Sequence, residues 1–78
     1  MGTNFMKNLG QLARRQEERL AVRLLIAQYQ RKNLPVPAAS ALSNQAARIV
    51  EEAHRIAHER GRSIASILKE MIQDFKEK

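Results

Sequence analysis

The first regular pattern of apolar and polar residues runs from residue 4 to residue 32. At about 100° per residue, its apolar residues fall on one stripe of a helix, which Gln16 interrupts. The stripe consists of Phe5, Met6, Leu9, Leu12, Ala13, Leu20, Leu24 and Ala27. The pattern predicts a long first helix. Gly10 is expected to weaken its start by about 1 kcal/mol relative to alanine.

Between residues 20 and 29 the apolar positions spread beyond this stripe. A helix that is apolar on most sides is usually buried on most sides. This part of the helix is therefore predicted to form either a dimer interface or the centre of the fold. The residues predicted for the interface are Leu20, Leu24, Leu25, Ile26 and Tyr29.

Two prolines, Pro35 and Pro37, end the first pattern and predict a linker over residues 33–39, because proline fixes φ and removes a backbone donor. A second helix is predicted over residues 40–60, with Ser40 as its N-cap. Its apolar stripe consists of Leu42, Ala46, Ile49, Val50, Ala53, Ile56 and Ala57.

A glycine turn separates the second helix from a third, predicted over residues 63–77. Gly61 suits the left-handed position that ends a helix, and Ser63 can cap the next one. The third apolar stripe consists of Ile64, Ile67, Leu68, Met71, Ile72 and Phe75. Together the patterns predict one all-α domain, residues 1–78, with a long N-terminal helix followed by a C-terminal helical hairpin.

The size of the chain bears on its assembly. A chain of 78 residues buries only about 60–65% of its unfolded surface, so a lone core is marginal. Without cysteine there is neither a disulfide nor a thiolate metal site, and two histidines do not predict a structural zinc site. Oligomerisation is the remaining source of stability, so we expect a homodimer.

The net charge of +6 is concentrated in the first half of the chain. Residues 1–39 carry seven cations against two acids, whereas residues 40–78 carry seven against six. Such asymmetry can attract nucleic acid, an acidic protein or an anionic membrane, although an Arg-rich solvated helix face is the simplest alternative. The basic residues concerned are Arg14, Arg15, Arg19, Arg23, Arg31 and Lys32. Three of them, at four-residue steps from Arg15, share one helix face and can follow a phosphate backbone.

The turn Gly61-Arg62-Ser63, approached by Ile56-Ala57 and followed by Ser66, Leu68 and Ile72, resembles the helical part of an Arc-type ribbon-helix-helix repressor. The resemblance covers roughly the last thirty residues. It implies an intertwined dimer whose strand, near residues 38–44, enters the DNA major groove. It also implies that Arg62 and Ser63 lie at a phosphate, which a helix N-terminus favours. The alternative for these two residues is an ordinary capped helix.

No chemistry of catalysis is predicted. The sequence contains no recognisable pair of a nucleophile and a general base, and no glycine-rich phosphate loop. We therefore expect neither enzyme activity nor a cofactor, a metal or a small-molecule substrate. His54 and His58 share a helix face with Glu51 but are expected to be surface residues. The longest apolar run is too short to span a bilayer, and no secretory signal is apparent. We therefore expect a cytoplasmic, bacterial-type protein that does not bind membranes.

Two functions follow as hypotheses. The first is a DNA-associated regulator that acts as a dimer. The second is a helical protein-interaction or structural module without a nucleic-acid role. A paired strand near Ser40 would favour the first, and a continuous helix there would favour the second.

Overall fold

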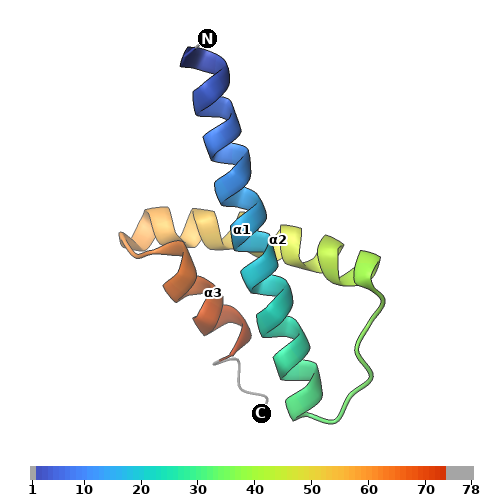
Figure 1. Cartoon of the computed structure of the whole chain (residues 1–78). Coiled ribbons are helices and arrows are strands. Elements are labelled where there is room, and N and C mark those ends of the chain that lie inside the picture. Colours follow the sequence, from blue (N-terminus) through green and yellow to red (C-terminus); the bar gives the residue numbers. More distant parts are fainter. Residues whose placement is uncertain (1, 74–78) are drawn as a thin grey trace.

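The computed structural model describes residues 2–73, with side chains from residue 10, and in this range it contains three helices and no strand (Figure 1). Helix α1 spans Gly2–Arg31, α2 spans Ala39–Arg60 and α3 spans Ile64–Ile72. The predicted all-α class, with a long N-terminal helix and a C-terminal hairpin, is confirmed. The third helix, predicted to run to residue 77, ends at Ile72 with Gln73 as its C-cap, and residues 74–77 lie outside the described residues.

The three helices meet where α1 crosses α2. Figure 1 shows α2 running across the middle of α1, while α3 turns back to lie beside the C-terminal half of α1. Each helix contacts the other two. The N-terminal half of α1 projects beyond both neighbours. The 30-residue helix therefore has one half inside the fold and one half outside it.

The core is formed by small and branched side chains at this crossing. Ala46 and Ala53 of α2 and Ala21 of α1 are fully buried, which lets the helix backbones approach closely. Val50, Ile67 and Leu68 are the largest fully buried side chains. The complete buried set is Ala21, Leu24, Leu25, Leu42, Ala46, Val50, Ala53, Ala57, Ile67, Leu68 and Ile72.

The buried face of α1 coincides with the predicted apolar stripe only in the second half of the helix, where Leu24 is buried and Leu20 is partly buried. Leu12, on that stripe, is 53% exposed, and Ala13 is exposed as well. Ala21, off the stripe, is completely buried. The physical reason is that only the second half of α1 packs in the core, where Ala21 belongs to the same buried cluster as the alanines of α2.

The residues predicted for a dimer interface lie in or against this intramolecular core. Leu24 and Leu25 are buried within the chain, and Leu20, Ile26 and Tyr29 are partly buried against the same cluster. The central position of α1 between α2 and α3 accounts for its broad apolar surface. Dimerisation stays a prediction.

The start of α2 differs by one residue from the expected one. The helix begins at Ala39, and its N-cap is Ala38 in place of Ser40, with no side-chain hydrogen bond. The backbone N–H of Leu42 donates to the Ala38 carbonyl at 3.0 Å, and Leu42 is buried. Because Leu42 must reach the core, its burial determines the residue at which α2 begins, and a serine N-cap does not determine it.

The turn between α2 and α3 follows the sequence prediction closely. Gly61 takes φ 65°, and the Arg62 N–H donates to the Ala57 carbonyl at 3.1 Å, which closes the last turn of α2. The Ser63 hydroxyl accepts a hydrogen bond from the Ser66 N–H at 3.2 Å, so Ser63 is the N-cap of α3.

Candidate nucleic-acid interface

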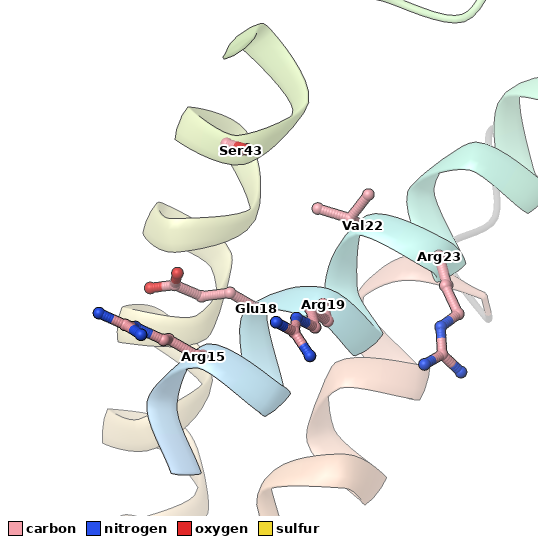
Figure 2. A pocket seen from close by; sticks show the side chains of 6 residues that line it. All are labelled: Arg15, Glu18, Arg19, Val22, Arg23 and Ser43. Carbon is pink, nitrogen blue, oxygen red and sulfur yellow. The ribbon is translucent and has the colours of Figure 1, made fainter. Parts of the chain in front are cut away.

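Three arginines form a row along the exposed side of α1 (Figure 2). Arg15, Arg19 and Arg23 line an open groove with a volume of about 430 Å³, together with Glu18, Val22 and Ser43. Four residues of helix advance by about 6 Å, so the three guanidinium groups extend over about 12 Å of helix. We call Arg15, Arg19 and Arg23 the arginine row. Its spacing could be read from the sequence.

The arginine row has no carboxylate partner. Within residues 10–73, no ion pair involves Arg14, Arg31 or any member of the row. Glu18 lines the same groove, and Figure 2 shows it beside Arg15, yet it forms no ion pair there. The guanidinium groups of the row are therefore available to an external anion.

Arg55, Arg60 and Arg62, in α2 and in the turn, behave differently, whereas Arg48 of α2 has no ion pair within residues 10–73. Arg55 bonds to Glu52 and, at 3.0 Å, to Glu59. The hydrogen bond from Arg55 lowers the pKa of Glu52 below its ordinary value. Arg60 lies 3.7 Å from a carboxylate oxygen of Glu70. The positive charge at this end of the molecule is largely compensated, whereas the charge of the arginine row is not.

An interhelical contact pairs one of the two acids of α1. The Oε1 atom of Glu17 lies 2.6 Å from Nε2 of His54, which joins α1 to α2. Glu17 is 24% exposed, and His54 is 41% exposed. The sequence placed His54 with His58 on the surface; His58 is exposed, but His54 makes a tertiary contact. Among the described residues no group of histidines and acids can hold a metal ion.

The contact between Glu17 and His54 is expected to contribute about 0.5–1 kcal/mol to stability, a range that allows for its partial exposure. A double-mutant cycle with Glu17→Gln and His54→Gln measures this coupling by urea denaturation at constant pH. Additive effects of the two substitutions would show that the contact does not form in solution.

Arg62 and Ser63 are not part of the arginine row. The Arg62 guanidinium donates to Glu70 and to the Ser66 hydroxyl, and the Ser63 hydroxyl caps α3. Ser43, in the groove, and Arg62 lie near opposite ends of α2. These contacts are those of an ordinary capped helix, which was the alternative for these two residues.

The C-terminal end of α1 belongs to a second groove. Its volume is about 360 Å³, and it is lined by Leu25, Gln28, Tyr29, Lys32, Leu34, Gln45, Ile49, Met71 and Ile72. Tyr29 is the one aromatic residue among those with described side chains. Because Tyr29 lines this second groove, the arginine row has no aromatic platform for a base among residues 10–73.

Sequence reasoning did not identify Ser43 and Val22 as walls of the groove. No local signal marks either residue, because the groove exists only where α2 crosses α1. In residues 2–73 no helix is apolar over a length that would cross a membrane. Comparisons with protein families, with curated proteins and with solved structures found no match.

Proposed function

We propose that this chain is a non-enzymatic binding module whose arginine row holds the phosphate backbone of DNA. The observation that carries the proposal is that Arg15, Arg19 and Arg23 have no carboxylate partner among residues 10–73. Like charges four residues apart on a helix cost about 0.2–0.5 kcal/mol per pair. A phosphate chain along the row relieves this repulsion and releases counterions from the nucleic acid.

The composition of the groove favours a particular kind of recognition. Arginine and serine side chains bind phosphate oxygens, which position a protein without specifying a sequence. None of the described residues that line the groove is aromatic, which favours a duplex over a single strand. The arginine row therefore serves backbone binding. The dimeric, regulatory role predicted from the sequence is retained as part of the proposal.

The proposed mechanism does not use the DNA-binding strand of the Arc-type repressors that the C-terminal helices resemble. Residues 39–44, where the resemblance implies part of a strand, are the first turns of α2. The proposed contact with DNA is made instead by α1.

A salt titration tests the proposed function. With three phosphate contacts, the slope of log K against log salt concentration is expected to be about −2.7 for the wild type. Arg19→Gln is expected to make the slope about 1 unit shallower. The matched control is Arg60→Gln, which removes the same charge from the far end of α2. Fluorescence anisotropy of a labelled duplex measures both. Absence of salt-dependent binding at low ionic strength would refute the proposal.

A second function is favoured by two observations. A continuous helix from Ala39 is the arrangement expected of a helical interaction module, and Leu12 is 53% exposed on the projecting half of α1. In that case Leu12→Asp would abolish self-association in sedimentation equilibrium, and the wild type would not bind DNA. A wild type that sediments as a monomer and binds DNA would exclude this alternative.

A further inference from the structure

The N-terminal half of α1 stands clear of the rest of the fold (Figure 1). We call residues 4–16 of this helix the arm. Every residue from 10 to 16 is exposed, and from residue 10 onward the first fully buried residue is Ala21. At 1.5 Å per residue the arm is about 20 Å long. An isolated helix of this length is only marginally stable in water, so contact with an external partner would stabilise it.

The charge of the arm selects the kind of partner. Residues 1–16 contain Lys7, Arg14 and Arg15 and no aspartate or glutamate. Two arms packed against each other would bring like charges together, so a second copy of this chain is a poor complement. A polyanion is a good one.

The spacing of polar residues along the arm has its own pattern. Gln11 and Arg15, four residues apart, share a helix face, and the sequence places Asn4 and Asn8 in the same register. Asparagine and glutamine side chains pair with adenine through its base edge in the major groove. Leu12 lies about 60° around the helix from Arg15 and is suited to contact a thymine methyl group.

We propose that the arm lies in the major groove of duplex DNA, with the face that holds Gln11 toward the base edges. This inference rests on the proposed function: the arginine row, which begins at Arg15 within the arm, holds the phosphates beside the groove. A helix about 10–12 Å in diameter fits a major groove about 12 Å wide. The arm then contributes sequence preference, and the arginine row contributes the salt-dependent part of the affinity.

Two neighbouring substitutions test the arm in opposite directions. Gln11→Pro breaks the helix within the arm and is expected to weaken duplex binding about tenfold. Gly10→Ala is expected to tighten it severalfold, because a Cβ at this position has nothing within 4 Å and favours the helix. Residue 10 and residue 11 are both exposed, so urea midpoints should stay near that of the wild type.

The placement of the arm in the major groove of DNA is tested with a modified duplex. Its thymines carry a bulky substituent at C5, which fills the major groove and leaves the phosphates unchanged. The wild type is expected to bind this duplex about tenfold more weakly than the unmodified one. In a panel of duplex sequences, Gln11→Ala is expected to lose the preference that the wild type shows.

The possible results separate this inference from the proposed function. Equal binding to both duplexes, with no effect of Gln11→Pro, would overturn the placement of the arm. The slope change of Arg19→Gln would then still support backbone binding. If neither duplex binds in a salt-dependent manner, the proposed function fails together with the inference, and an acidic protein becomes the partner to test.

Discussion

Replacing Leu68 by alanine is expected to lower the free energy of unfolding by about 2–5 kcal/mol. Leu68 is completely buried on α3, where it contributes to the cluster that holds all three helices together. A single core in a chain of this length rarely supplies more than about 3–5 kcal/mol. The substitution is therefore expected to leave much of the population unfolded at 25 °C.

Leu12→Ala is the matched control for this prediction, because it deletes the same atoms from a side chain that is 53% exposed. Its effect is expected to be within about 0.5 kcal/mol. Urea denaturation followed by circular dichroism at 222 nm measures both variants. Equal losses at the two positions would contradict the core described above.

Replacing all three members of the arginine row by glutamine is expected to reduce affinity for duplex DNA about 100-fold at low salt. At about 1 kcal/mol for each lost phosphate contact, three contacts account for a decrease of this size. Most of the salt dependence should disappear as well. Glutamine keeps the helix propensity of arginine, so the fold should be retained.

The control for this triple variant changes the charge equally at other arginines. Arg55, Arg60 and Arg62 are all paired with carboxylates of α2 or α3. Their replacement by glutamine is expected to weaken binding far less than replacement of the row. Equal losses for the two triple variants would mean that total charge, and not the row, governs binding.

Local features of this fold were predictable from the sequence. The apolar spacing predicted three helices, and Gly61 and Ser63 predicted how one ends and the next begins, because such caps depend on residues within one or two turns. The row from Arg15 to Arg23 followed from four-residue spacing within one helix.

Features that depend on the helix crossing were not predictable. The sequence placed Leu12 and Ala13 on the buried stripe, but that part of α1 projects from the fold, and the structure instead buries Ala21 in the cluster with the alanines of α2. The entry of the chain into α2 at Ala39, the contact between Glu17 and His54, and the position of Ser43 in the groove all depend on that crossing. None is set by neighbouring residues.

The same helix supplies part of the core and carries the arginine row, so folding and ligand binding are thermodynamically linked. The groove that includes Ser43 exists only when α2 is packed across α1. A ligand that occupies it therefore binds the folded chain in preference to the unfolded one. At a free concentration of 100 times Kd, such a ligand adds about 2.7 kcal/mol to stability. For a domain with so small a core, occupancy of the groove would set how much of the chain is folded.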